Sequence, residues 1–202
     1  MWYSINAAIK SGCFEEVMVS TDSDEYKEIA VECGAHVPFL RSARNSGSTA
    51  SSWDTVKEVL EGYRGLGEEF DTVALLQPTS PLRTPKHIRE GYELLSAKEA
   101  NAIIGVAETE HSPLWENILP SDFNMAGFIK PEILNQPRQK LPVYYRINGA
   151  LYIVRVGVLH EIERLYDNKC FAYVMSKMDS VDIDTDLDFR LAEVLMEIKR
   201  DL

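Results

Sequence analysis

The chain has 202 residues, of which 45% are hydrophobic and 26% are charged, so it can fold around a hydrophobic core of its own. It carries 21 Lys and Arg against 32 Asp and Glu, and its formal net charge is −11. These values exclude intrinsic disorder, a disulfide-stabilised miniprotein and a general duplex-DNA binder, because DNA binding requires a basic face. A local anion site on a few Arg, Lys or helix N-termini is compatible with them.

The cysteines Cys13, Cys33 and Cys170 lie far apart and show no metal-ligand spacing, which is typical of reduced, buried thiols. No run of about 18 apolar residues is present, and the first residues lack the basic and apolar regions of a signal peptide. We therefore expect a cytoplasmic protein that binds neither a membrane nor nucleic acid.

Apolar residues at helical spacing open the chain, and strand and helix patterns alternate after them. The first half is predicted to contain a helix (2–11), a short strand (16–20), a helix (25–33), an extended run (35–40), a polar loop (41–52) and a helix (53–63). The second half is predicted to contain a buried strand (71–76), a helix (85–97), a strand (102–107), an irregular excursion (111–147), a strand (149–154), a helix (158–166), a strand (171–175) and a helix (186–199). This alternation indicates an α/β fold.

Two of these segments differ in how they use apolar residues. The excursion contains five prolines and many apolar residues without a helical or strand period, so we expect it to leave the sheet and to expose an apolar surface. The last helix has a regular apolar face, which we expect to point inward. That face consists of Leu187, Leu191, Val194, Leu195 and Ile198.

The clearest signal for a site is the acidic run from Asp182 to Asp188. Asp182 and Asp184 are two residues apart after an extended segment, which places both carboxylates on one side of a strand end. Such a pair suits Mg²⁺, which takes one or two carboxylates together with substrate phosphates. Acidic residues at a helix start also favour the helix dipole, so the spacing leaves metal binding and helix capping open.

Two polar loops follow predicted strands, at the position where α/β proteins bind ligands. The loop at 77–83 reads Gln-Pro-Thr-Ser-Pro-Leu-Arg, in which the prolines fix a turn and Gln77 suits a base edge or a sugar hydroxyl. The loop at 41–52 carries Arg41 and a Ser-rich run, a combination that can hold a nucleotide. Ordinary turn and capping roles are the alternative for both loops, and they are the favoured interpretation for the Ser-rich run alone.

Arg138 and Arg146 lie in or beside the excursion. A guanidinium group can pair with a carboxylate through two hydrogen bonds, so both residues are candidates for binding an acidic substrate. The alternative interpretation is that they are surface arginines of an acidic chain.

Several strings, taken in their order along the chain, resemble one family over essentially the whole sequence. They are Val-Ser-Thr-Asp-Ser (19–23), Thr-Ala-Ser-Ser (49–52), Leu-Leu-Gln-Pro-Thr-Ser-Pro-Leu-Arg (75–83), Gln-Pro-Arg-Gln (136–139), Arg-Ile-Asn-Gly-Ala-Leu-Tyr (146–152) and Ser-Val-Asp-Ile-Asp-Thr (180–185). In this order and at this separation they are similar to the strings of CMP-sialic acid synthetases, also called acylneuraminate cytidylyltransferases. The resemblance is most specific at 77–83 and 182–185.

The resemblance implies a Rossmann-like nucleotidyltransferase fold, with a mostly parallel sheet flanked by helices. It implies a single domain over 1–202, in which 111–147 is a dimerisation and substrate-covering excursion, and a homodimer. The implied reaction converts CTP and a nine-carbon α-keto acid sugar into the CMP-sugar and pyrophosphate. In such a reaction the protein acts mainly by positioning its substrates and neutralising phosphate charge.

The family's site residues can be transferred by position. The nucleotide-binding residues are then Arg41, Ala50, Ser52 and Gln77, the sugar-binding residues are Gln77, Arg138, Arg146, Asn148 and Tyr152, and the catalytic residues are Arg138, Asp182 and Asp184. The resemblance implies that Asp182 and Asp184 also hold Mg²⁺, which would neutralise phosphate charge. An arginine would pair with the sugar carboxylate.

One family feature does not appear in these residues. The N-terminal signature, a Gly- and Lys-rich loop that cradles the triphosphate, would sit just before Met1. We therefore expect the chain to be part of a longer one, to be inactive and poorly stable by itself, and to leave a gap in the sheet beside the strand at 16–20. The alternative to a cytidylyltransferase is a non-catalytic nucleotide- or sugar-binding paralogue that has lost this loop.

Overall fold

The fold is known from a computed structural model that describes residues 1–47 and 49–200. Its helices are α1 (Trp2–Ser11), α2 (Asp24–Glu32), α3 (Ser52–Gly65), α4 (Pro85–Ala97) and α5 (Asp186–Arg200), and its strands are β1 (Thr72–Leu75), β2 (Ala102–Glu108), β3 (Tyr145–Arg155) and β4 (Cys170–Val174). Short 3₁₀ segments are η1 (Ala43–Asn45), η2 (Pro113–Trp115), η3 (Arg138–Lys140), η4 (Val156–Arg164) and η5 (Lys177–Asp179). All five predicted α-helices that correspond to α1–α5 are confirmed to within two residues at each end.

The helix ends follow from local chemistry. Helix α1 stops at Gly12, which adopts the left-handed conformation (φ 68°) and donates its backbone N–H to the carbonyl of Ile9. Helix α4 starts with Pro85, whose missing N–H is not needed in the first turn. Such signals lie within a few residues of each end, which is why the sequence predicts these bounds well.

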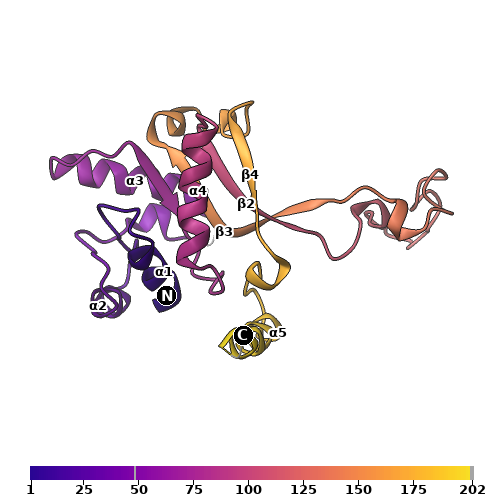
Figure 1. Ribbon diagram of the computed structural model, residues 1–202, viewed down its shortest axis with the longest axis horizontal. Coiled ribbons are helices and arrows are strands. Elements are labelled where there is room, and N and C mark those ends of the chain that lie inside the picture. Colours follow the sequence, from indigo (N-terminus) through magenta and orange to yellow (C-terminus); the bar gives the residue numbers. More distant parts are fainter. Residues whose placement is uncertain (48, 201–202) are drawn as a thin grey trace.

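The four strands form one mixed sheet in the order β1-β3-β2-β4 (Figure 1). Strand β3 is antiparallel to both neighbours, whereas β2 and β4 are parallel. Three strands therefore run in one direction and the central β3 opposes them. This confirms the predicted α/β fold, with a sheet that is mixed because its longest strand is reversed.

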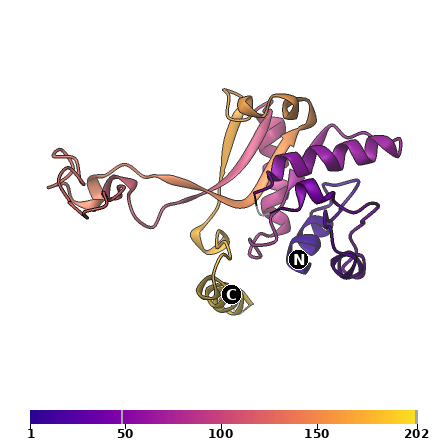
Figure 2. The ribbon, with the colours of Figure 1, turned by 180° about the vertical axis from the view of Figure 1, so that it is seen from behind.

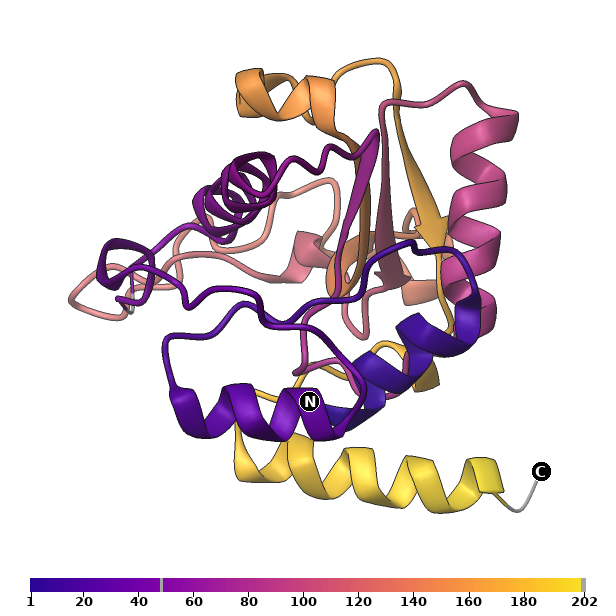
Figure 3. The ribbon, with the colours of Figure 1, turned by 90° about the vertical axis from the view of Figure 1, so that its left-hand side faces the viewer.

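Helices cover both faces of the sheet, and alternate residues of β3 point to opposite layers. Leu151 and Ile153 pack with residues of α1 and α4, including Ile88. Tyr152 and Val154 pack with residues of α3 and η4 on the other face. Figure 3 shows α4 on one side of the strands and α3 on the other. The result is a three-layer α/β/α body.

Two predicted strand segments are reduced in the structure. The segments at 16–20 and 35–40 meet only through a single parallel bridge between Met18 and His36. This pair lies outside the four-stranded sheet, which ends at β1 in the described residues. The predicted helix at 158–166 is also different, since it is a 3₁₀ segment (η4) with a kink at Glu161.

The excursion leaves the body as predicted. Figures 1 and 2 show it as a long projection carried by the end of β2 and the start of β3. Apolar side chains on it stay in solvent, including Ile118, which is 90% exposed, and Phe123, which is 74% exposed. In the described parts of the chain, no helix combines the length and apolarity needed to cross a membrane.

The predicted inward face of α5 is wrong in this structure. Leu187 is 75% exposed, and three further members of that face are also exposed: Leu191, Val194 and Ile198. The helix lies at the edge of the body (Figure 1) and packs through a neighbouring face that contains Ala192, Leu195 and Met196. The sequence periodicity located an apolar stripe correctly but did not show which stripe meets the body.

Candidate active site

An open cavity of about 470 Å³ lies where the first part of β3 meets η5, the acidic run and α5. It brings together three of the predicted site residues, Arg146, Asp182 and Asp184. The remaining lining residues are Glu110, Lys177, Met178, Ser180, Val181, Asp188, Leu191 and Leu195. The cavity thus has a polar, charged side and an apolar side that comes from α5.

The two roles considered for the acidic run, helix capping and metal binding, concern different residues. Asp188 caps α5, since its Oδ2 accepts from the backbone N–H of Thr185 at 2.8 Å and from the Thr185 hydroxyl at 2.7 Å. These hydrogen bonds lower the pKa of the Asp188 carboxyl. In contrast, Oδ1 of Asp182 is buried and has no hydrogen-bond partner in the part of the chain that the structure describes. A buried carboxylate oxygen without a donor is costly, which is typical of a position that binds a ligand.

The donor set around Asp182 fits a Mg²⁺ ion that is shared with substrate phosphates. Asp182 and Asp184 both line the cavity, and Asp184 is exposed. Within residues 1–47 and 49–200, no cluster of three or more His, Cys, Asp or Glu side chains could enclose a metal ion. Two carboxylates at an open position match Mg²⁺, which keeps its other ligands as water or phosphate oxygen.

Of the two candidate arginines, Arg146 lines the cavity and Arg138 contacts one of its lining residues. Arg146 donates to the backbone carbonyl of Ser180 at 2.9 Å, which holds its guanidinium beside the acidic run. Arg138 lies in η3 and donates to the backbone carbonyl of Glu110, a lining residue. Arg146 therefore lines the cavity directly, whereas Arg138 is exposed next to its rim.

Sequence reasoning missed Lys177, which also lines the cavity. Its ammonium group pairs with Glu108 at 3.6 Å and with Glu110 at 3.9 Å, so it joins the segment after β4 to the end of β2. Neither motif nor spacing marks Lys177 in the sequence. Only the parallel pairing of β2 and β4 brings these three residues together.

Two predicted sugar-binding residues, Asn148 and Tyr152, are not among the residues that line the cavity. Asn148 is fully buried, and its amide donates to the Ser180 hydroxyl at 2.9 Å and accepts from the backbone N–H of Ala150 at 3.1 Å. Its polar atoms are therefore used inside the protein. Tyr152 packs edge-on against Trp53 on the α3 face, with ring centroids 5.8 Å apart. Burial raises the pKa of its phenol, and the Asp182 carboxylate adds to this effect.

The predicted nucleotide-binding loop lies apart from the cavity lining. Arg41 donates to the Ser46 hydroxyl at 3.3 Å and pairs with Asp22 at 3.5 Å. Ala50 is half-buried, and Ser52 is exposed in the first turn of α3. The structure thus groups Arg41, Ala50 and Ser52 around the start of α3, and none of them lines the cavity.

The side chain of Glu58 holds this loop in place. Its carboxylate accepts from the backbone N–H of Ser42 at 2.6 Å and from the Ser42 hydroxyl at 2.5 Å, and it also contacts the Asn45 amide. These hydrogen bonds lower the pKa of the Glu58 carboxyl. Glu58 therefore fixes the backbone next to Arg41, a role that no sequence motif indicates.

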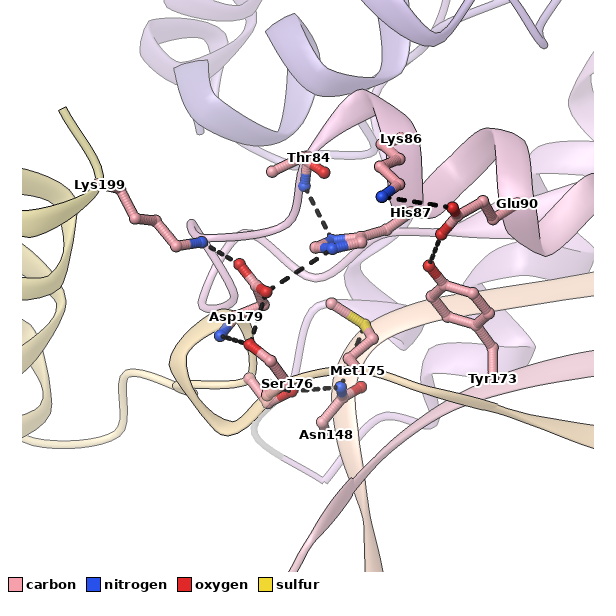
Figure 4. A network of polar contacts seen from close by, with 11 residues as sticks. Thr84, Lys86, His87, Glu90, Asn148, Tyr173, Met175, Ser176, Asp179 and Lys199 are labelled. Atoms are coloured by element: carbon pink, nitrogen blue, oxygen red, sulfur yellow. Dashed lines mark hydrogen bonds and ion pairs between the residues drawn. The ribbon is translucent and has the colours of Figure 1, made fainter. Parts of the chain in front are cut away.

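A polar network anchors the turn that precedes the acidic run (Figure 4). Asp179, at the end of η5, forms an ion pair with Lys199 of α5 and lies 3.7 Å from Nε2 of His87 in α4. Its carboxylate also accepts from the Ser176 hydroxyl at 2.6 Å. The network ties η5 to two helices only three residues before Asp182.

His87 gives this network a pH dependence. The backbone N–H of Thr84 donates to Nδ1 of His87 at 3.2 Å, so this ring nitrogen carries no proton. Burial lowers the pKa of the His87 imidazole, and the nearby Asp179 carboxylate only partly opposes this. Because this pKa is depressed, the neutral imidazole contributes to stability at pH values above its ordinary pKa near 6.5. This contribution is lost as the pH falls below that value.

The free energy of unfolding should therefore fall as the pH is lowered from 7 to 5, and His87→Gln should flatten part of this decline. Glutamine keeps the acceptor for the Thr84 N–H, as in a capping box, but it does not titrate. Urea unfolding at several pH values measures the effect. An unchanged slope in His87→Gln would contradict the assignment.

Comparison with solved structures identifies the fold. The structure of CMP:2-keto-3-deoxy-manno-octonic acid synthetase complexed with CTP matches with a TM-score of 0.65, 15% identity, and coverage of 99% of this chain and 87% of the other. The fold is thus that of the α/β nucleotidyltransferases.

Sequence comparisons identify the family. The profile of the family described as Cytidylyltransferase matches residues 1–116. CMP-N,N'-diacetyllegionaminic acid synthase of Legionella pneumophila subsp. pneumophila is 34% identical over 98% of this chain and 85% of its own length. N-acylneuraminate cytidylyltransferase of Streptococcus agalactiae is 34% identical over 94% of this chain, which spans 45% of that protein. The chain belongs to the cytidylyltransferase family.

Proposed function

We propose that this protein transfers CMP from CTP to the anomeric hydroxyl of a nine-carbon acid sugar and releases pyrophosphate. The observation that carries the proposal is the cavity lined by Asp182, Asp184 and Arg146, in which Oδ1 of Asp182 has no hydrogen-bond partner among the described residues. Two carboxylates suit a metal-bound triphosphate, and an arginine suits an acidic sugar. The names of the Legionella and streptococcal relatives support the same substrate class.

The chain's own residues act mainly by positioning. Arg146 would bind the sugar carboxylate through two hydrogen bonds, and Arg138 would supply further positive charge at the rim of the cavity. Asp182 and Asp184 would hold Mg²⁺ against the triphosphate. When bound, this ion supplies charge neutralisation for the phosphates. With the nucleotide and the sugar fixed side by side, the anomeric hydroxyl would attack the α-phosphorus as readily as in an intramolecular reaction.

The proposal is tested by measuring pyrophosphate release from the protein expressed from its complete reading frame. CTP is offered with N-acetylneuraminate, a legionaminic acid, a pseudaminic acid or 2-keto-3-deoxyoctonate, with and without Mg²⁺. We expect release with at least one nine-carbon sugar, and only when CTP and Mg²⁺ are both present. Binding of CTP or sugar without release would instead indicate a non-catalytic paralogue.

We also propose that the excursion forms a homodimer interface. Ile118 and Phe123 are the most exposed of its large apolar side chains, and such groups in number usually mark an interface. Ile118→Asp combined with Phe123→Asp should shift the protein from dimer to monomer in light scattering at micromolar concentration. The control is Leu66→Asp, at an exposed apolar position outside the excursion, which should stay dimeric. A wild-type monomer under these conditions would refute the interface.

A further inference from the structure

The loop 77–83 contacts three consecutive residues of β3, which are Asn148, Gly149 and Ala150. The two segments lie far apart in the sequence. The loop follows β1 directly, while the β3 residues lie near the cavity end of that strand. The contacts are Ser80 Oγ to the Asn148 carbonyl at 3.3 Å, Gln77 against Gly149, and Arg83 Nε to the Ala150 carbonyl at 2.8 Å.

Residues 148–150 of β3 can contact the loop because this part of the strand lies beyond its pairing with β1. Strand β1 pairs with β3 only from Tyr152 onward, so within the described chain the preceding residues have no strand partner on that side. On the other side the register with β2 shifts between Ile104 and Val106. The carbonyl groups of Asn148 and Ala150 accept hydrogen bonds from the loop side chains of Ser80 and Arg83.

Gly149 provides the space in which the Gln77 amide lies. Its φ is +72°, a conformation that costs an L side chain energy. A Cβ atom at Gly149 would lie 2.2 Å from Oε1 of Gln77 and 3.3 Å from the Ser80 hydroxyl. Any side chain at this position would have to push the Gln77 amide away from β3.

Arg83 fixes the main chain of the same glutamine. It is only 3% exposed, and its Nη2 donates to the Gln77 carbonyl at 2.7 Å and to the Ser4 hydroxyl at 3.0 Å. Burial lowers the pKa of the Arg83 guanidinium to about 10, so the group stays charged at neutral pH. In the described residues its hydrogen-bond partners are all neutral oxygens, and they lie on α1, the loop 77–83 and β3.

We propose that Arg83 and Gly149 are positioning residues that together set the direction of the Gln77 amide. Arg83 holds the carbonyl end of the residue, and Gly149 leaves room for its side chain. The amide then faces its ligand in one orientation, as recognition of a neutral partner such as a base edge or a sugar hydroxyl requires. This inference rests on the proposed function and on the substrate contact that the sequence resemblance implies for Gln77.

A double-mutant cycle tests whether Gly149 acts through Gln77. Gly149→Ala, Gln77→Ala and the double variant are compared for kcat and for the KM of CTP and of the acid sugar. We expect Gly149→Ala to raise one of the two KM values about tenfold, and this effect to fall below about twofold in the Gln77→Ala background. An effect of the same size in both backgrounds would overturn the proposal.

The control separates backbone strain from the contact with Gln77. Gly12 also has a positive φ, +68°, but a Cβ atom there would meet nothing within 4 Å. Gly12→Ala therefore introduces comparable strain without a neighbour, and both KM values should stay within about twofold of the wild type. A KM increase equal to that of Gly149→Ala would assign the effect to strain.

A second measurement reads the orientation of Gln77 without turnover. In ¹H–¹⁵N spectra of the full chain, the side-chain amide pair of Gln77 is identified by its loss in Gln77→Ala. Gly149→Ala and Arg83→Lys should shift this pair, because lysine cannot reproduce the fork of hydrogen bonds that arginine makes, and Gly12→Ala should not. An unmoved pair in both variants overturns the positioning role. A shifted pair with unchanged KM values supports it and refutes instead the proposed contact between Gln77 and substrate.

Discussion

Exchange of Asp182 for Asn should lower pyrophosphate release at least about a hundredfold while leaving the metal-free protein no less stable than the wild type. The first effect follows from loss of a charged ligand for the metal-bound triphosphate. The second follows from burial, since Oδ1 of Asp182 has no donor in the described residues, and a neutral amide costs less to bury than a carboxylate. Activity assays against Mg²⁺ concentration and thermal melts in chelator measure both effects.

Two neighbouring acidic residues serve as controls for this prediction. Asp186→Asn, at an exposed position in the first turn of α5, should change neither activity nor melting temperature by much. Asp188→Asn should weaken the cap on Thr185 and so lower stability, with little change in the Mg²⁺ dependence. Unchanged Mg²⁺ dependence in both Asp182→Asn and Asp184→Asn would remove the metal from this site.

Asn148→Ala should lower the free energy of unfolding by about 2–4 kcal/mol, a large part of a typical total of about 5–15 kcal/mol. The change leaves a cavity at a fully buried position and takes the acceptor away from the Ala150 N–H. It also removes the amide donor to the Ser180 hydroxyl, one of the bonds that hold the turn before the acidic run.

Urea unfolding measures this loss, and sugar KM values show whether Asn148 also contacts substrate. The exposed Asn135→Ala is the matched control and should leave stability unchanged. A raised sugar KM with unchanged stability would mean that Asn148 contacts the sugar, as the sequence resemblance implies, and would contradict a purely structural role.

Helices and their ends were the part of the fold that the sequence predicted best. Gly12 and Pro85 mark helix ends through effects that act within one turn, so the pattern alone locates them. The prediction of a strand at 16–20 was wrong for the opposite reason. An apolar run becomes a strand only where another strand pairs with it, and in the described residues Met18 has a single bridge partner. Pairing is a long-range property that the run itself does not contain.

The candidate site shows the same division. Asp182 and Asp184 line one cavity with Arg146, which lies in a separate segment of the sequence. Asn148 and Tyr152 do not, although simple alternation along β3 would put both on the side of Arg146. The shift in register between β2 and β3, together with the positive φ of Gly149, breaks that alternation. The sequence shows that position 149 is a glycine, but it does not show the register shift beside it.

The reversed central strand has a consequence for the order of events during synthesis. Both neighbours of β3 leave the ribosome before it does, and β1 must wait for residues 152–155, about 80 residues later. At a synthesis rate of about 5–20 residues per second this is a delay of roughly 4–16 s for β1, and β2, once synthesised, also waits for both of its partners, β3 and β4. The sheet closes only when the excursion is complete and β3 returns from it. The length of the excursion therefore sets when β3 becomes available to the nascent chain. A shorter excursion should let β3 pair earlier and should speed folding.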